Sequence, residues 1–266
     1  MLELNKIYNM DCIEGMKLIP DGSIDLTVTS PPYDNLRTYN WYSWDFEAVA
    51  KELFRVTKVW WIVVRVVWDS VVKWSETLTS FKQALFFKEI GFNVHDTMIF
   101  EKDVLAFPDF NRYYQKFEYM FVFSKWKPKT TNLIEDRRNI WWWVDIKWWY
   151  RDVDWYIKQK SGNKKGKKVK EMGIRFNIRK YNVWRNKSYK EDFLKWHPAI
   201  FPEKLAEDHI ISWSNEWDTV LDPFMWSWTT AKMAIINKRN YIWFELSKEY
   251  CDIIEARLKS VQNHLF

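Results

Sequence analysis

The C-terminal part of the chain alternates strands and helices, and this order constrains the fold more than any other feature. Residues 218–224 and 241–245 form short apolar runs that predict two buried strands. Helical periodicity follows each run, over residues 229–237 and 249–261. Parallel strands need a crossover connection, usually a helix, so this order predicts an α/β fold with a parallel sheet covered by helices.

The first 124 residues predict the same fold class and add an antiparallel edge. Apolar runs and helical spacing predict, in order, a strand, a helix, a strand and a helix over residues 24–29, 46–56, 62–67 and 81–90. Residues 94–101 and 118–124 predict two antiparallel strands. Arg65 lies inside one buried run, so it requires a buried partner.

Residues 125–190 differ from both flanks, because they are basic, aromatic and poorly periodic. One interpretation is a solvated, mobile loop, since a lysine-rich, glycine-spaced run cannot pack. The other is an arm that contacts nucleic-acid phosphates, flanked by side chains that stack on bases or bind their edges. The candidate DNA-binding residues are Lys164, Lys165, Lys167, Lys168, Arg175, Arg179 and Arg185.

Charge and cysteine content narrow the class of protein further. A net charge of +6 favours a polyanionic partner. Two distant cysteines give neither a disulfide framework nor a zinc motif, and the four histidines lack metal-ligand spacing. We therefore expect a reducing, cytoplasmic setting and no metal. The longest apolar run, near residues 59–68, is too short to span a bilayer and contains Arg65.

Tryptophan is unusually frequent and glycine unusually rare. The chain has 20 Trp and 6 Gly, whereas average usage predicts about 19 Gly. Many Trp residues stand where turns favour glycine, which alone adopts positive φ without steric penalty. They are Trp60, Trp61, Trp68, Trp126, Trp217, Trp226, Trp228 and Trp243. We hypothesise that many of them occupy former glycine positions, through engineering or sequence misassignment.

A stiff polar turn follows the strand predicted at residues 24–29. It reads Thr29-Ser30-Pro31-Pro32-Tyr33. Two prolines restrict the backbone and remove N–H donors, which leaves carbonyls, a hydroxyl and an aromatic ring at the carboxyl end of the strand. Such a turn suits a planar amine, although a proline-rich turn with a core tyrosine explains these residues equally well on their own.

A second turn of this kind follows the strand at residues 218–224. It runs from Asp222 to Thr230 and leads into a helix, whose N-terminus presents free N–H groups. Glu245 ends the next strand. An acid at this place, about 20 residues after Asp222, can accept hydrogen bonds from both ribose hydroxyls of a nucleoside cofactor. No GxGxxG is present, which disfavours a dinucleotide. The alternative is a capped βαβ unit in which Glu245 is a surface acid.

Together these motifs resemble the β class of DNA amino-methyltransferases. Residues 29–33 resemble their catalytic (D/N/S)-PP-(Y/F) motif, and residues 222–230 resemble DPFxGSGTT, which binds S-adenosylmethionine. Residues 197–203 resemble the preceding HPAxFPE segment. The order of the motifs also matches the β class. The likeness covers most of the chain outside residues 125–190, and it departs from the family at Trp226 and Trp228, where the family has glycine.

The resemblance implies a Rossmann-like methyltransferase fold, with a mostly parallel sheet of the seven-stranded type, helices on both faces and an antiparallel edge. It implies a catalytic half over residues 1–124, a target-recognition insertion over 125–190 and a cofactor-binding half over 191–266. The implied substrate is the exocyclic amine of a flipped adenine (N6) or cytosine (N4) in double-stranded DNA, modified at a specific site as in restriction-modification systems. Relatives of this class often form homodimers.

The resemblance also assigns site residues. Ser30, Pro31, Pro32 and Tyr33 are the catalytic residues it implies. The implied S-adenosylmethionine contacts are Asp11, His197, Pro198, Asp222, Phe224, Ser227, Thr229, Thr230 and Glu245. An alternative function is a catalytically silent DNA-binding protein in which Trp226 and Trp228 block the cofactor loop. An RNA amino-methyltransferase is a third interpretation, which the motif order disfavours.

Overall fold

The computed structural model describes residues 2–31, 45–103, 111–145, 149–151, 154, 156–159, 167–183, 202–224, 228–252, 254–255 and 258. The chain divides into two compact units, Met1–Asn132 with Asn177–Phe266, and Leu133–Phe176. The first unit contains the main sheet with its helices. Several predicted site residues lie outside the described residues, namely Pro32, Tyr33, Lys164, Lys165, Arg185, His197, Pro198 and Ser227.

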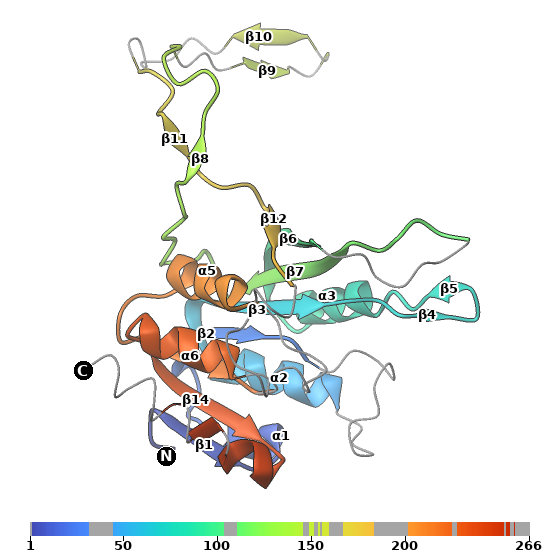
Figure 1. The fold of residues 1–266 in the computed structure, drawn as a ribbon, viewed down its shortest axis with the longest axis vertical. Coiled ribbons are helices and arrows are strands. Elements are labelled where there is room, and N and C mark those ends of the chain that lie inside the picture. The colour runs from blue at the N-terminus through green and yellow to red at the C-terminus, as the bar shows by residue number, and fades with distance from the viewer. Residues whose placement is uncertain are drawn as a thin grey trace. The chain divides into compact units, whose positions relative to one another are not determined.

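The first unit is built around a sheet of 8 strands in the order β1-β14-β13-β2-β3-β7-β6-β12 (Figure 1). The strands are β1 (Lys6–Asn9), β2 (Ile24–Thr29), β3 (Thr57–Val67), β6 (Asn93–Lys102), β7 (Phe117–Ser124), β12 (Ile178–Tyr181), β13 (Thr219–Asp222) and β14 (Asn240–Glu245). The five strands from β1 to β3 are all parallel, and β7 alone is antiparallel to its neighbours. The predicted mostly parallel sheet with an antiparallel pair is confirmed.

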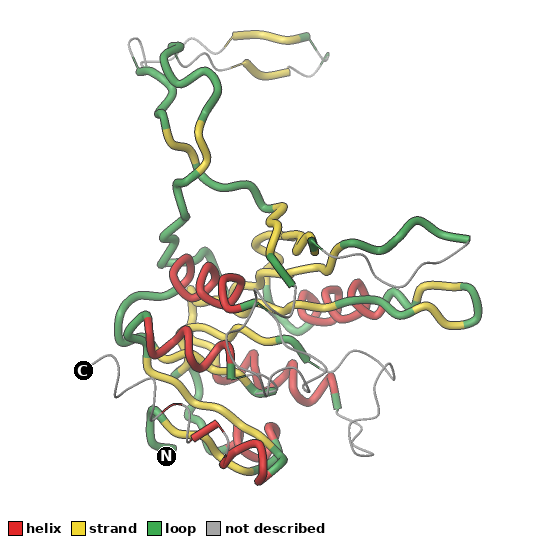
Figure 2. The backbone as a smooth tube through the Cα atoms, viewed as in Figure 1, coloured by secondary structure: helices red, strands yellow, loops and turns green. Residues whose placement is uncertain are grey.

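Helices cover both faces of this sheet (Figure 2). They are α1 (Cys12–Lys17), α2 (Phe46–Val56), α3 (Thr79–Glu89), α5 (Glu203–Trp213) and α6 (Thr229–Ile236). Residues 248–252, 254–255 and 258 are also helical. Alternate side chains of each buried strand face opposite layers, so Val64 packs with α5 and α6 while Val63 packs with α1, α2 and α3. Among the described residues, no helix combines the length and apolar character that crossing a bilayer requires.

The described part of the second unit contains short antiparallel pairs. Strand β8 (Arg137–Arg138) pairs with β11 (Met172–Gly173), and β9 (Trp149–Arg151) pairs with β10 (Ile157–Gln159). This unit, Leu133–Phe176, is shorter than the insertion predicted over residues 125–190. One reason is that residues 178–181 form β12, which pairs with β6 in the main sheet.

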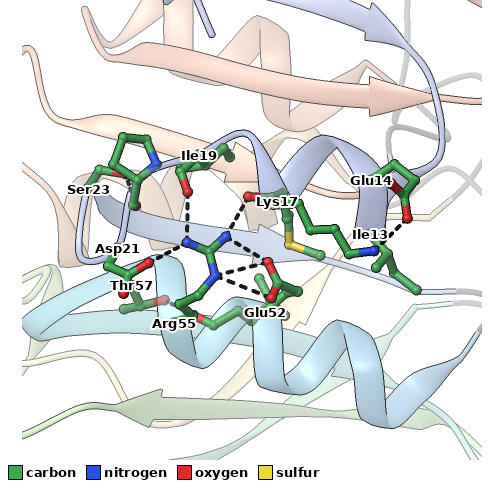
Figure 3. A network of polar contacts seen from close by, with 12 residues as sticks. Ile13, Glu14, Lys17, Ile19, Asp21, Ser23, Glu52, Arg55 and Thr57 are labelled. Atoms are coloured by element: carbon green, nitrogen blue, oxygen red, sulfur yellow. Dashed lines mark hydrogen bonds and ion pairs between the residues drawn. The ribbon is translucent and has the colours of Figure 1, made fainter. Parts of the chain in front are cut away.

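One polar network fixes the start of β2 (Figure 3). Arg55 of α2 donates from Nη1 to the Ile19 carbonyl at 2.8 Å and from Nη2 to the Glu52 carboxylate at 2.7 Å. It also pairs with Asp21 at 2.5 Å. Since Asp21 lies in the turn between α1 and β2, the network ties α2 to the entry of β2. The other end of β2 carries the first of the two sequence motifs.

Candidate functional site

Four parallel strands bring the predicted site residues to one edge of the sheet. Strands β1, β14, β13 and β2 are consecutive and parallel, so their carboxyl ends lie at the same edge. Asp11 follows β1, Glu245 ends β14, Asp222 ends β13 and Ser30 follows β2. In open α/β sheets this edge is where ligands bind. The motifs that are distant in sequence therefore converge here.

A buried hydrogen bond joins the two motifs directly. The Thr29 hydroxyl donates from Oγ1 to Asp222 Oδ1 at 2.9 Å, across 193 residues of sequence. Thr29 is 1% exposed and Asp222 is 3% exposed. Asp222 Oδ1 also accepts from the Phe224 amide at 3.1 Å. The carboxylate thus fixes the backbone of its own turn and holds it against the end of β2.

Burial controls the ionisation of Asp222. Removal from water, together with the weaker effect of the nearby Glu245 charge, raises the pKa of this carboxyl to about 7. Hydrogen bonds from the Phe224 amide and the Thr29 hydroxyl oppose the rise, since they stabilise the carboxylate. Asp222 therefore changes charge near neutral pH.

Glu245 is the second acid at this edge. Burial raises its pKa to about 7, although the hydrogen bond from the Ser247 amide opposes the rise. The Ser247 amide donates to Oε1 at 2.7 Å, and Oε2 accepts no hydrogen bond from any described residue. The Asn9 side chain donates to the Glu245 carbonyl at 2.9 Å, which ties the ends of β1 and β14 together. One carboxylate oxygen is thereby left for a ligand.

The other predicted cofactor contacts have local roles as well. Asp11 is the N-cap of α1, and its Oδ1 accepts from the Ile13 amide at 2.8 Å and the Glu14 amide at 3.2 Å. Helix capping by Asp11 was not part of the sequence prediction, although an aspartate before helical spacing is the usual signal for it. Thr229 and Thr230 open α6 and are buried.

Arg65, the charged residue within a buried strand, contacts two aromatic rings and a glutamine side chain. It pairs in register with Thr29, so it lies at the carboxyl end of β3 beside the first motif. Its guanidinium lies 5.1 Å from the Phe46 ring and 5.0 Å from the Phe87 ring, and it donates to Gln83 Oε1 at 2.9 Å. These contacts satisfy the charge through cation–π attraction and a hydrogen bond. They also support the end of β2 from its neighbouring strand.

The predicted DNA-binding residues are found in different environments. Lys167 and Lys168 are exposed in the second unit. Arg175, also in that unit, pairs with Asp136, with Nε 2.9 Å from Oδ1. Arg179 belongs to the first unit, is 7% exposed and forms an ion pair with Asp208 at 3.4 Å. Because Arg179 serves within the protein core, we leave it out of the DNA contacts proposed below.

The raised pKa values of Asp222 and Glu245 predict how the stability of the cofactor-free protein varies with pH. Both acids bind protons more tightly when folded, so their contribution is fully present below the unfolded-state pKa values of 3.8 and 4.5 and is lost as the pH rises from there through about 7. For Asp222, a rise from 3.8 to about 7 corresponds to on the order of 4 kcal/mol in all, at about 1.4 kcal/mol per unit, of which about 2 kcal/mol is lost above pH 5.5. We expect calorimetry to give a lower melting temperature at pH 8 than at pH 5.5.

Asp222→Asn should flatten this pH dependence, whereas Asp252→Asn should not. Asp252 is an exposed acid in an ion pair with Lys248, so it serves as the matched control. A melting temperature of the parent protein that rises between pH 5.5 and pH 8 would contradict the burial argument.

Comparison with known proteins identifies the family. The sequence profile of the DNA methylase family, N6_N4_Mtase, matches residues 24–256. The chain belongs to this family. It is 59% identical to the orphan methyltransferase M.BamHII of Bacillus amyloliquefaciens over 242 residues, 91% of each chain. It is 28% identical to the type II methyltransferase M.BglII of Bacillus subtilis, over 94% of this chain and 68% of that one.

Solved structures agree with this assignment at the level of the fold. PvuII DNA methyltransferase (cytosine-N4-specific) superposes with a TM-score of 0.69 at 18% identity, over 99% of this chain and 93% of that chain. The M1.HpyAVI–SAM complex gives a TM-score of 0.58 at 22% identity, over 95% and 98%. The recognition of a β-class amino-methyltransferase with a Rossmann-like fold is confirmed.

Proposed function

We propose that this methyltransferase transfers a methyl group from S-adenosylmethionine to the exocyclic amine of adenine (N6) or cytosine (N4) in double-stranded DNA. The observation that carries the proposal is the hydrogen bond from Thr29 to Asp222. It joins the motif that resembles the catalytic loop to the motif that resembles the cofactor loop. A base held by the first would therefore lie next to a methyl donor held by the second.

The residues at the sheet edge suit this cofactor. Glu245 offers a carboxylate oxygen that accepts no hydrogen bond from any described residue, as a ribose diol requires. Near pH 7 it can ionise, and an ionised acceptor forms stronger hydrogen bonds. Phe224 follows Asp222 directly and would contact the methionine end of the cofactor together with the start of α6. We extend the proposed contacts to Asp11, His197, Pro198, Ser227, Thr229 and Thr230.

S-adenosylmethionine supplies a methyl group on a sulfonium, which needs an oriented nucleophile and no metal. The protein orients the target amine. The Ser30 hydroxyl and the Pro31 carbonyl would accept hydrogen bonds from the amine, which directs the nitrogen lone pair toward the methyl group. Tyr33 would stack on the flipped base, with Pro32 stiffening the turn between them. In this mechanism positioning supplies most of the rate enhancement.

The DNA would be engaged by the second unit and its flanks. Base flipping costs a few kcal/mol of unstacking and unpairing, which contacts to phosphates and neighbouring bases must offset. We propose Lys164, Lys165, Lys167, Lys168, Arg175 and Arg185 for these contacts. We further propose that the insertion over residues 125–190 reads a specific site, as in restriction-modification systems, and that the protein acts in the cytoplasm. Homodimer formation stays a prediction, which sedimentation would test.

The test is incubation of unmodified double-stranded DNA with isotopically labelled S-adenosylmethionine, followed by nucleoside mass spectrometry. Labelled N6-methyladenine or N4-methylcytosine is the expected result, and it identifies the base. DNA binding without product would favour the catalytically silent alternative. Label in a matched RNA substrate but not in DNA would favour the RNA methyltransferase. Calorimetry with cofactor alone distinguishes a blocked cofactor site from a defect in DNA binding.

A further inference from the structure

Tryptophan is concentrated at backbone positions that favour glycine. Eight described residues other than glycine have positive φ, and four of them are Trp. These four are Trp60 (φ 73°), Trp74 (φ 69°), Trp217 (φ 70°) and Trp228 (φ 42°). The left-handed region brings Cβ close to the following carbonyl oxygen, which only glycine avoids. Tryptophan has no short polar side chain to offset this penalty, as asparagine does.

Trp74 shows the conflict most clearly. Strands β4 (Val71–Val72) and β5 (Ser75–Glu76) form a hairpin in which Val72 pairs with Ser75. The two residues between them, Lys73 (φ 48°) and Trp74, both have positive φ. A two-residue loop of this kind is a type I′ turn, whose second position most often holds glycine. The Trp74 side chain is 81% exposed, so packing gives no reason for an indole there.

Trp217 and Trp60 occupy two further irregular positions. Trp217 lies in the turn before β13, where its amide donates to the Lys238 carbonyl at 2.8 Å. It is 68% exposed. Trp60 lies where the register of β2 with β3 shifts, between the pairs Ile24–Thr57 and Leu26–Ile62. Glycine adopts the positive φ of this irregular position without steric cost.

Trp228 and Trp243 add positions near the proposed cofactor site. Trp228 is the residue before α6 and is 2% exposed. Trp243 in β14 is fully buried, and its indole Nε1 has no hydrogen-bond partner among the described residues. A buried indole N–H usually has a partner.

Trp213 has the environment of an ordinary buried tryptophan. It lies within α5, is 3% exposed, and donates from Nε1 to His209 Nδ1 at 3.2 Å. Its backbone is helical and its donor is satisfied. The chain therefore contains two kinds of tryptophan position, one suited to an indole and one suited to glycine.

We propose that glycine is the functional residue at positions 60, 74, 217 and 228. In this proposal the four positions share one codon, which the source cell translates as glycine and which a different genetic code translates as the tryptophan of this sequence. UGA fits, since different genetic codes assign it to termination, tryptophan or glycine. A single cause of this kind accounts for positions scattered over a hairpin, a bulge and two turns. It also accounts for the scarcity of glycine, 6 residues in 266.

The gene and the native protein test this proposal directly. UGA is expected at codons 60, 74, 217 and 228, and UGG at codon 213. Peptides of the protein isolated from its source cells should have masses that correspond to glycine at positions 74 and 217. UGG at all five codons, or native peptides that contain tryptophan at these positions, would overturn the proposal.

Variants of the recombinant chain test the backbone argument independently. Trp74→Gly should raise the melting temperature by about 2–4 °C, the shift expected for roughly 1 kcal/mol in a chain of this size. Trp74→Ala keeps a Cβ and should give no such rise, which separates backbone relief from removal of an exposed indole. Trp213→Gly should lower the melting temperature. An equal rise for Trp74→Gly and Trp74→Ala, or none for either, would refute the argument. Neither experiment depends on methyl transfer.

Discussion

Tyr33→Ala is expected to lower the turnover number for DNA methylation by roughly 5- to 150-fold, because stacking of a base on an aromatic side chain is worth about 1–3 kcal/mol. S-adenosylmethionine affinity should change little. Tyr33 follows the two prolines at the end of β2, whereas the proposed ribose acceptor, Glu245, ends β14. Strand β13 lies between these two strands in the sheet.

The expected loss is therefore specific to the base-binding side. Tyr33→Phe retains the ring and should keep most of the activity, which makes it the matched control. Single-turnover kinetics with saturating DNA would measure the chemical step, and calorimetry would measure cofactor binding. Equal losses of turnover and cofactor affinity in Tyr33→Ala would argue against stacking and in favour of general damage to the site.

Local sequence patterns predict the elements that hold the site. The sequence predicts a helix over residues 46–56, and α2 has the same bounds. Its apolar residues recur at helical spacing, and Asp45 caps its start by accepting from the Ala48 amide. The strands that end in Thr29, Asp222 and Glu245 were also predicted, because continuous apolar runs are typical of buried parallel strands.

Contacts between distant residues could not be predicted in the same way. Strand β12 alternates exposed and buried residues, but its inward residues are Arg179 and Tyr181, so it has no apolar pattern. Its burial makes sense only with Asp208, which accepts a hydrogen bond from Tyr181 at 2.9 Å and pairs with Arg179. The hydrogen bond from Thr29 to Asp222 could not be predicted for the same reason, because nothing in the sequence near either residue indicates a partner 193 residues away.

The ionisation of two acids, Asp222 and Glu245, could not be predicted from the sequence either. The sequence places Asp222 and Glu245 at strand ends, but it does not show that Asp222 is buried and Glu245 half-buried. In the structure, burial raises the pKa of both carboxyls to about 7. Deprotonation can therefore be coupled to cofactor binding near neutral pH.

Glu245→Ala is expected to weaken S-adenosylmethionine binding by roughly 100-fold or more, since hydrogen bonds to a charged group contribute about 1.5–3 kcal/mol each and a ribose offers two hydroxyls. The affinity of the parent protein should rise between pH 6 and pH 8, as Glu245 ionises through a pKa of about 7. The variant should lose most of this pH dependence. Isothermal titration calorimetry at several pH values measures both effects.

Asp252→Ala provides the control for this experiment, because Asp252 is a nearby exposed acid that pairs with Lys248. It should bind cofactor like the parent protein. Glu245→Gln keeps an acceptor of similar size without the charge, so its affinity should lie between those of the parent and Glu245→Ala, with no rise toward pH 8. Affinity in Glu245→Ala equal to that of the parent would remove Glu245 from the cofactor site. The end of β14 would then contribute structure rather than binding.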